Sequence, residues 1–365
     1  MPRLPTSIIL RARALHPLLP LLLRPCRDLS SARNELRWLR EHAIANREVT
    51  LTSSGSIKTS WPQHLYQMCR SRARGKPLQY ILGSQPFGEL EILCRRGVLI
   101  PRPETENITT HLASLLLSPP SRPQHPLRIL DLCTGTGCIP LLLHSLLAPR
   151  TPSLHLHGVD ISPAALTLAA KNLSHNITKS QLRANAREQI SFTHGDIFAA
   201  GAKPWCESKW DILISNPPYI SPSSFNATTS RSVRNYEPKS ALVPSSADPI
   251  AGNPESYADT GDRFYPRLLD LAERVSARVL LVEVADMEQA VRVGEMVVEK
   301  GRGVWDGCEI WRDWPAAGAE EGGEVVEVKG GDVRVRGEGN GRAVLAWKGE
   351  DGGRMVGKKK ASASG

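Results

Sequence analysis

The sequence lacks any cluster of cysteines that would form a metal site or a disulfide framework. Its seven cysteines are scattered along 365 residues, with no C-x-x-C pair and no Cys/His group at zinc spacing. An odd number of scattered cysteines favours reduced thiols, and therefore a cytosolic or matrix-like compartment. We expect no bound metal.

The chain also lacks an apolar run long enough to span a membrane. The most apolar stretch, ALHPLLPLLL, is short and is interrupted by His16, Pro17 and Pro20. We therefore expect no membrane-embedded segment.

Excess positive charge is absent from the body of the chain, although the formal net charge is +9. Residues 1–40 contribute +6 and residues 354–360 contribute +4, which leaves −1 for residues 41–353. A broad phosphate-binding face needs clustered lysines and arginines. The charge distribution therefore gives no support for a nucleic-acid substrate.

Residues 1–33 have the composition of a mitochondrial presequence. They are rich in Arg, Leu and Ser, and no acidic residue precedes Asp28. A secretory signal is the alternative, but Arg11 and Arg13 separate its two apolar stretches. We expect a mitochondrial presequence and location in the matrix.

The rest of the chain divides by pattern. Residues 34–83 have helical spacing of apolar residues and predict a small helical domain, and residues 84–104 (FGELEILC and GVLI) predict a β-hairpin linker. Residues 105–348 alternate strand-like and helix-like segments, which predicts an α/β fold with a doubly wound, mostly parallel sheet. Residues 316–332 resemble a Gly-rich insertion, and residues 349–365 predict a disordered tail.

A glycine-rich turn follows the first buried strand of this alternation, in LDLCTGTGCIPL. Glycines at such a turn let a ligand approach the backbone, and free N–H groups face it from the start of the next helix. The third glycine of the dinucleotide fingerprint is missing. The residues of this turn that we assign to a cofactor are Asp131, Cys133, Thr134, Gly135, Thr136 and Gly137.

Acidic residues end the next two strands. Asp160 ends the strand in GVD, where it would hold ribose hydroxyls, and Asp196 and Ile197 follow the third strand, where they would bracket an adenine. Each Asp alone could be a helix cap or a turn residue. No hydride-transfer partner or phosphate-binding lysine lies near the loop, so S-adenosylmethionine is preferred to NAD or ATP as the cofactor.

The turn Asn216-Pro217-Pro218-Tyr219 follows the strand WDILIS. Prolines keep this turn extended and leave nearby carbonyls free to accept from a ligand. The Asn216 side-chain oxygen and the Pro217 carbonyl could accept both hydrogens of one NH2 group, and the Tyr219 ring could pack on it. The alternative interpretation is a stiff proline turn. We predict catalytic roles for Asn216, Pro217 and Tyr219, substrate contacts from all four residues, and a place for Asn216 beside the cofactor.

The sequence resembles the HemK-type (PrmC-like) release factor glutamine methyltransferases. The motifs GKPLQYILG, VLIPRPETE, DLCTGTG, GVD, SNPPYI and YEP occur in that family's order between about residues 34 and 348. The resemblance implies a seven-stranded methyltransferase sheet and methylation of the glutamine amide in the GGQ motif of a release factor. It also implies that the small helical domain contacts this partner, which we expect to be mitochondrial, and we expect the enzyme to be a monomer.

Four points qualify this interpretation. Cys133 and Cys138 flank the glycine loop, where the family more often has small residues. Arg102 and Glu104 could either form a salt bridge within a turn or line a substrate pocket. A nucleic-acid adenine N6-methyltransferase shares the NPPY turn and is the alternative enzyme, although it needs a basic groove. A cofactor-binding assembly factor without catalysis is the alternative outside enzymes.

Overall fold

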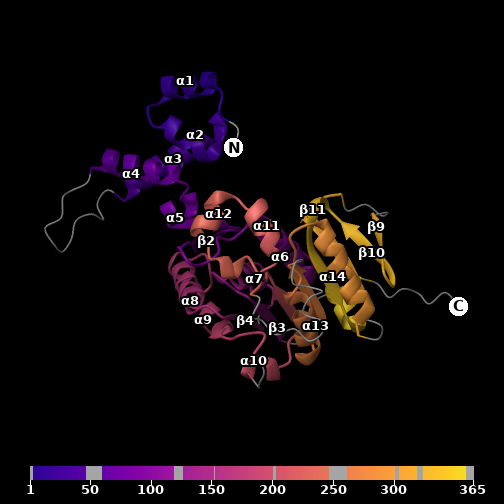
Figure 1. The fold of residues 1–365 in the computed structure, drawn as a ribbon. Helices are drawn as coiled ribbons and strands as arrows, with labels where there is room; N and C mark the ends of the chain where they lie inside the picture. Colours follow the sequence, from indigo (N-terminus) through magenta and orange to yellow (C-terminus); the bar gives the residue numbers. More distant parts are fainter. Residues whose placement is uncertain are drawn as a thin grey trace. The chain divides into compact units, whose positions relative to one another are not determined.

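The computed structural model describes residues 3–46, 60–118, 126–151, 153–199, 203–245, 261–300, 304–318 and 324–358. The chain forms two compact units (Figure 1). The first comprises residues 1–85, 94–96 and 230–237, and the second comprises residues 86–93, 97–229 and 238–365. No helix of the described segments is long and apolar enough to cross a bilayer.

The first unit is helical. Its helices are α1 (Thr6–Leu15), α2 (Leu19–Cys26), α3 (Leu29–Ala45), α4 (Trp61–Ala73), α5 (Leu78–Leu82) and α12 (Arg231–Tyr236). Asp28 caps α3 by accepting from the Ser31 N–H at 2.8 Å. Glu35 of α3 accepts two hydrogen bonds from the Arg72 guanidinium of α4, at 2.8 and 2.9 Å. This two-pronged pair fixes α4 against α3.

The helical unit begins well before residue 34, where we had placed the end of a presequence. Leu19, Leu22 and Leu23 recur on one face of α2 and lie in the same buried core as Leu39 of α3. His16 and Pro17 interrupt the apolar stretch as expected, because they lie between α1 and α2. Pro20 does not, because it lies in the first turn of α2, where proline is tolerated. The expected boundary at residue 33 falls inside α3. The targeting role of residues 1–33 stays a prediction.

A two-stranded sheet of β1 (Ser84–Phe87) and β2 (Leu90–Leu93) precedes the large sheet in the chain. In the second unit, two buried asparagines of α8 (Pro163–Thr178) bind β2. Asn172 Oδ1 accepts from the Leu93 N–H at 2.7 Å, and Asn176 Oδ1 accepts from the Glu91 N–H at 3.0 Å. The stretch GVLI at residues 97–100, which we expected to pair in this hairpin, contains no strand. Its backbone instead runs along the cavity described below.

The expected doubly wound, mostly parallel sheet is confirmed. It has nine strands in the order β5-β4-β3-β6-β7-β11-β8-β10-β9. The bounds are β3 (Leu127–Leu132), β4 (Leu154–Asp160), β5 (Ile190–His194), β6 (Ile212–Ser215), β7 (Val279–Glu283), β8 (Gly307–Trp314), β9 (Val325–Val328), β10 (Gly331–Arg336) and β11 (Glu338–Trp347). Strands β3 to β7 pair in parallel, and β11 runs antiparallel between β7 and β8. Part of the expected insertion forms β9 and the start of β10, which extend the seven expected strands at one edge.

Helices cover both faces of the sheet. Alternate residues of β3 enter two separate cores: Leu127 and Ile129 enter one, and Leu130 and Leu132 enter the other. This alternation is expected of a strand that is buried on both faces. The larger helices of this unit are α6 (Pro103–Leu117), α7 (Cys138–Leu147), α8, α13 (Phe264–Arg274) and α14 (Met287–Lys300). Figure 1 shows α14 lying along the late strands β8 and β11.

The start of the expected disordered tail is folded. Helix α15 (Gly349–Met355) follows β11, and Met355 and Val356 are buried in the same core as Leu127. Lys358 forms an ion pair with the buried Glu309 of β8. The Gly-rich composition concealed this helix because its only large apolar residues lie at its end. Residues 359–365 lie outside the described residues.

The order of the strands determines where a ligand can bind. The chain runs outward from β3 through β4 to β5 and then returns to β6 on the other side of β3. A crevice forms at such a reversal, beyond the carboxyl ends of the two central strands. Leu132 at the end of β3 pairs with Ser215 at the end of β6. The glycine turn and the NPPY turn therefore leave the sheet side by side.

Candidate active site

The glycine turn has the backbone conformation that its glycines predict. Cys133, Gly135 and Gly137 all have positive φ values, of 64°, 55° and 76°. A Cβ atom on Gly137 would lie 3.0 Å from both Ala169 and Phe192, so the turn also needs glycine for close packing. The turn leads directly into α7. Three of its N–H groups are used within the protein: Thr134 donates to the Val159 carbonyl, Gly135 to Asp160 Oδ2 and Gly137 to the Thr134 carbonyl.

Asp160 holds this turn in place. Its carboxylate accepts from the Gly135 N–H through Oδ2 and from the Ser162 N–H through Oδ1, both at 2.8 Å. Burial raises the pKa of Asp160 above the ordinary value. Each carboxylate oxygen can accept more than one hydrogen bond. Asp160 can therefore shape the turn and still accept from ribose hydroxyls.

Asp131 is a buried acid beside the glycine turn. It is 1% exposed at the end of β3, and neither carboxylate oxygen is bonded to any of the described residues. Burial raises its pKa to about 8. Such a group is costly unless a cation or donor compensates it when the site is filled. An unpaired acid beside the glycine turn fits a ligand that carries an ammonium group.

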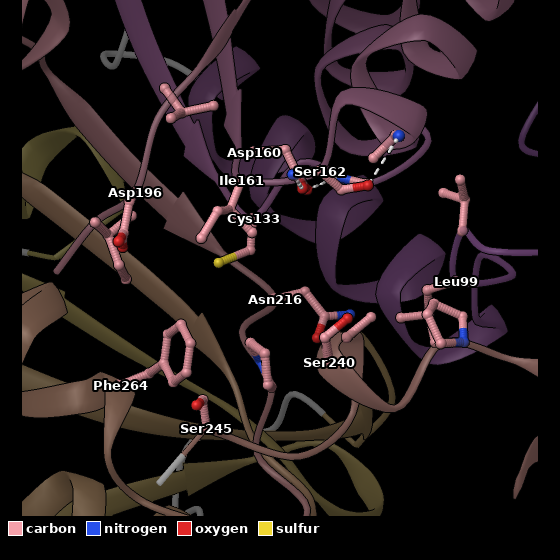
Figure 2. A pocket seen from close by; sticks show the side chains of 18 of the residues that line it. Leu99, Cys133, Asp160, Ile161, Ser162, Asp196, Asn216, Ser240, Ser245 and Phe264 are labelled. Carbon is pink, nitrogen blue, oxygen red and sulfur yellow. Dashed lines mark hydrogen bonds between the residues drawn. The ribbon is translucent and has the colours of Figure 1, made fainter. Parts of the chain in front are cut away.

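A cavity of about 190 Å³ opens above these strand ends. Figure 2 shows Cys133, Asn216, Ser240 and Phe264 around it, with Asp160 and Asp196 on the side of the first strands. The predicted site residues that line it are Cys133, Gly135, Asp160, Asp196, Ile197, Asn216 and Pro218. Asp131, Thr134, Thr136, Gly137, Pro217 and Tyr219 do not line it. Most of the lining is apolar.

Several lining residues were not predicted. They come from the stretch before α6, the start of α8, the loop after β5, the segment after the NPPY turn and the start of α13. They include Gly97, Val98, Leu99, Ile161, Ser162, Phe198, Pro238, Ser240, Ala241, Val243, Ser245 and Phe264. The motifs GVLI and YEP marked two of these segments, but nothing in the sequence directs them to a common cavity. No group of three or more His, Cys, Asp or Glu among the described residues could hold a metal ion.

The NPPY turn presents unused acceptors. Asn216 donates through Nδ2 to the Thr105 hydroxyl at 3.2 Å, and its Oδ1 makes no hydrogen bond with the described residues. Pro217 and Pro218 are buried. Ser215 anchors the start of the turn by donating to the Leu132 carbonyl at 2.7 Å. The hydrogen bonds of Ser215 and of Asn216 Nδ2 thus fix the turn, while Asn216 Oδ1 remains able to accept a hydrogen bond beside the cavity.

The Tyr219 side chain lies elsewhere than its predicted stacking role requires. Its ring packs against the core that contains Phe264, and its hydroxyl donates to Glu283 Oε1 at 3.2 Å. Burial and the neighbouring Glu283 raise its pKa. The Tyr219 side chain therefore holds the NPPY turn through contacts in the protein interior, on the side of Glu283.

Two buried residues behind the turn were missed by sequence reasoning. Thr105 donates to Glu283 Oε2 at 2.6 Å, and these residues are 3% and 5% exposed. Burial raises the pKa of Glu283 to about 7, although its hydrogen bond from Thr105 and the charge of Arg342 act in the opposite direction. The sequence contained a signal for Glu283, because it is an acid at the end of the wholly apolar strand VLLVE.

The fold and this site together define an S-adenosylmethionine-dependent methyltransferase. A glycine turn after the first strand, an acid after the second and a proline-rich acceptor turn after the fourth surround one cavity. The mostly apolar lining of the cavity fits the adenosine part of this cofactor.

Comparison with known proteins gives the family. The model of the methyltransferase small domain matches residues 109–235. The mitochondrial MRF1 N(5)-glutamine methyltransferase MTQ1 of Saccharomyces cerevisiae is 38% identical over 244 residues, which cover 67% of this chain and 68% of the yeast protein. A probable MRF1 mitochondrial N(5)-glutamine methyltransferase of Schizosaccharomyces pombe is 38% identical over 234 residues, which cover 62% and 69% of the two chains. The chain belongs to the release factor glutamine methyltransferase family, so the expected resemblance is confirmed.

Among solved structures, the N-terminal domain of human METTL16 superimposes with a TM-score of 0.45 at 16% identity. The match covers 86% of this chain and 93% of that domain.

Proposed function

We propose that this protein transfers a methyl group from S-adenosylmethionine to the side-chain amide nitrogen of the glutamine in the GGQ motif of a mitochondrial release factor. The observation that carries the proposal is the open Asn216 Oδ1 beside the cavity, whose Nδ2 is already engaged by Thr105. Family membership supplies the substrate class. The carbonyl of Pro217 is a second acceptor, since no described residue donates to it.

The chemistry follows from what a glutamine amide lacks. Its nitrogen lone pair is delocalised into the carbonyl, so it is a poor nucleophile in its planar form. Two acceptors that take its two N–H groups fix its orientation and favour a more pyramidal nitrogen in the transition state. Asn216 Oδ1 and the Pro217 carbonyl can provide this pair. Alignment of the nitrogen with the methyl group supplies much of the rate.

The bound cofactor supplies an electrophilic methyl group on a sulfonium. A nitrogen–carbon bond forms as the sulfur–carbon bond breaks, and that electron pair returns to sulfur, which becomes a neutral thioether. The methylated amide nitrogen then carries the positive charge and loses a proton to water. Because methylation makes this nitrogen strongly acidic, no strong general base is needed at the site.

For the cofactor, we propose that Thr134 to Gly137 border the methionine part and that Asp131 pairs with its ammonium. Asp160 would accept from the ribose hydroxyls, and Asp196 and Ile197 would bracket the adenine. These roles agree with the lining of the cavity by Gly135, Asp160, Asp196 and Ile197.

A methyl-transfer assay tests the substrate. Purified protein and labelled S-adenosylmethionine are offered a release factor, the same factor with its GGQ glutamine changed to alanine, and duplex and single-stranded DNA. We expect label on the unchanged release factor alone. Label on DNA alone would favour the adenine N6-methyltransferase, and label on neither would point to a cofactor-binding protein without this activity.

We further propose that the enzyme acts as a monomer in the mitochondrial matrix. The curated yeast relatives carry mitochondrial names, and the composition of residues 1–33 supports the same compartment. Protease protection of the tagged protein in isolated mitochondria, before and after rupture of the inner membrane, tests the matrix location. Light scattering of the purified protein tests the monomer.

A further inference from the structure

A chain of hydrogen bonds runs behind the Asn216 amide and ends at a buried acid. Asn216 Nδ2 donates to Thr105 Oγ1 at 3.2 Å, and Thr105 Oγ1 donates to Glu283 Oε2 at 2.6 Å. The other oxygen of Glu283 accepts from the Tyr219 hydroxyl at 3.2 Å. Helix α6, strand β7 and the NPPY turn each contribute a residue to this series of hydrogen bonds. None of these contacts belongs to the acceptor pair proposed above.

When Glu283 is ionised, this series of hydrogen bonds has one direction, because its last member can then only accept. An ionised carboxylate has no hydrogen to give, so Thr105 must donate its single hydroxyl hydrogen to Glu283. The Thr105 oxygen then has only lone pairs to offer Asn216. Of the two ends of the Asn216 amide, only the NH2 group can bond to a lone pair. The Asn216 oxygen is therefore held on the opposite side, beside the cavity.

The direction matters because an amide side chain can flip. A flipped Asn216 would present its NH2 group to the NH2 group of a substrate glutamine, and two donors cannot pair. In a shape-matched site without the acid, both orientations of the amide have similar hydrogen-bonding options. The buried acid removes the unproductive orientation before the substrate arrives.

We propose that Glu283 and Thr105 are positioning residues that fix the Asn216 amide with its oxygen toward the substrate. This inference rests on the proposed function, because it assigns the pair a purpose in glutamine methylation. Because Thr105 donates its hydrogen to Glu283, its oxygen can only accept from the NH2 group of Asn216. Tyr219 saturates the second carboxylate oxygen and ties the far end of the NPPY turn to the same acid.

The surroundings of Glu283 support a fixed carboxylate. Its own backbone carbonyl accepts from the Tyr265 hydroxyl at 3.1 Å, which anchors the end of β7. Arg342 of β11 donates to the carbonyls of the two following residues, Val284 and Ala285, at 3.4 and 2.9 Å. The acid therefore lies at a strand end whose backbone is held from two sides, and its two carboxylate oxygens accept from the Thr105 and Tyr219 hydroxyls.

The test compares two substitutions at position 105 with a control one helical turn away. Thr105→Val removes the hydroxyl and keeps the shape, whereas Thr105→Ser keeps the hydroxyl. Thr109→Val removes a buried hydroxyl of the same helix that bonds only to the Thr105 backbone carbonyl, at 2.7 Å. Glu283→Gln replaces the pure acceptor with a group that can also donate. Assays are run at about pH 8.5, where the acid is ionised.

We expect Thr105→Val to lower kcat by about tenfold or more and Glu283→Gln by about a hundredfold, with the Kd for S-adenosylmethionine within about threefold of wild type. Thr105→Ser and Thr109→Val should stay within about threefold of the wild-type kcat. A wild-type kcat in Thr105→Val would overturn the proposal. Equal losses in Thr105→Ser and Thr105→Val would do so too, because shape would then matter and the hydroxyl would not.

A second readout does not depend on turnover. In protein labelled with [15N]asparagine, the Asn216 side-chain NH2 signals are identified by their absence in Asn216→Ala. They should shift in Thr105→Val and Glu283→Gln but stay near their wild-type positions in Thr105→Ser and Thr109→Val. Unshifted signals in Thr105→Val would overturn the proposed positioning of Asn216 by Thr105 and Glu283. If wild-type protein methylates no release factor, the proposed function fails. The NH2 signals still test whether Thr105 and Glu283 position Asn216.

Discussion

Thr105 and Glu283 are 178 positions apart in the sequence, yet the Thr105 hydroxyl donates a 2.6 Å hydrogen bond to the Glu283 carboxylate. The bond joins the first turns of α6 to the carboxyl end of β7. It places an acid directly behind the turn that we assign to the substrate. Burial of this acid raises its pKa to about 7, and this shift has a measurable effect on stability.

The first prediction concerns stability and pH. A carboxyl whose pKa is raised by folding keeps its proton in the native state after the unfolded chain has lost it, so stability falls as the pH rises between the two pKa values. A rise from the ordinary 4.5 to about 7 corresponds to roughly 3 kcal/mol. We expect wild-type protein to lose about this much unfolding free energy relative to Glu283→Gln between about pH 4.5 and pH 7.5.

Denaturant unfolding of both proteins across this range provides the measurement. Other titrating groups act equally in both proteins, so the difference isolates Glu283. The charged or titratable groups that influence it, or respond to it, are Glu104, Cys138, Tyr219, Tyr265 and Arg342. A difference in unfolding free energy that does not change with pH would show that Glu283 has an ordinary pKa.

The second prediction separates catalysis from cofactor binding at Asn216. Asn216→Ala removes the open acceptor, so kcat should fall by about 100-fold to 1,000-fold. The Kd for S-adenosylmethionine, measured by calorimetry, should change by less than about threefold, because we propose that the residues at the ends of the first three strands hold the cofactor. Asn226→Ala changes an exposed asparagine of α11 (Pro222–Ala227) and should match the wild type. Unchanged turnover in Asn216→Ala would remove this residue from the mechanism.

The third prediction tests the unpaired carboxylate of Asp131. Asp131→Asn keeps the shape and removes the charge, so the affinity for S-adenosylmethionine should fall by about 10-fold to 100-fold, as expected for a lost charge-assisted hydrogen bond. An analogue of the cofactor that lacks the amino group provides the control. It should bind wild type and Asp131→Asn with similar Kd values. Equal weakening of both ligands would assign Asp131 a structural role in place of an ammonium contact.

The sequence was sufficient for those parts of the site that depend on local backbone chemistry. The glycine turn needs positive φ values at Gly135 and Gly137, and only a few residue types adopt them readily. The NPPY turn is stiff because each residue before a proline avoids the helical region. Parallel strands bring their carboxyl ends to one edge, so the sequence alone assigns Asp160 and Asp196 to the same end of the sheet.

The sequence was insufficient where distant segments meet. Nothing local links Thr105, which lies in the motif VLIPRPETE, to Glu283, which ends a buried apolar strand. The ring of Tyr219 could equally have faced the cavity or the core. Its direction depends on Glu283, which lies at the end of a neighbouring strand. Long-range pairing of buried polar groups thus determines which residues support the site.

The last prediction concerns the N-terminal helices, where composition and structure point in different directions. Leu19, Leu22 and Leu23 of α2 are each at most 2% exposed in the core of the helical unit. Burial of one leucine is worth about 1.5–3 kcal/mol, so the three together are comparable with the whole stability of a small domain. A chain that starts at residue 34 should therefore lose the fold of this unit.

Hydrogen exchange followed by mass spectrometry measures this loss. In the chain that starts at residue 34, peptides from α3 and α4 should exchange much faster than in the full-length protein, while peptides from α7 and β3 keep their protection. A chain that starts at residue 5 leaves all the helices intact and should behave as the full-length protein does. Leu22→Ala should give an intermediate loss of about 2–5 kcal/mol. Unchanged protection of α3 and α4 after removal of residues 1–33 would mean that α1 and α2 are dispensable, and the presequence boundary at residue 33 would stand.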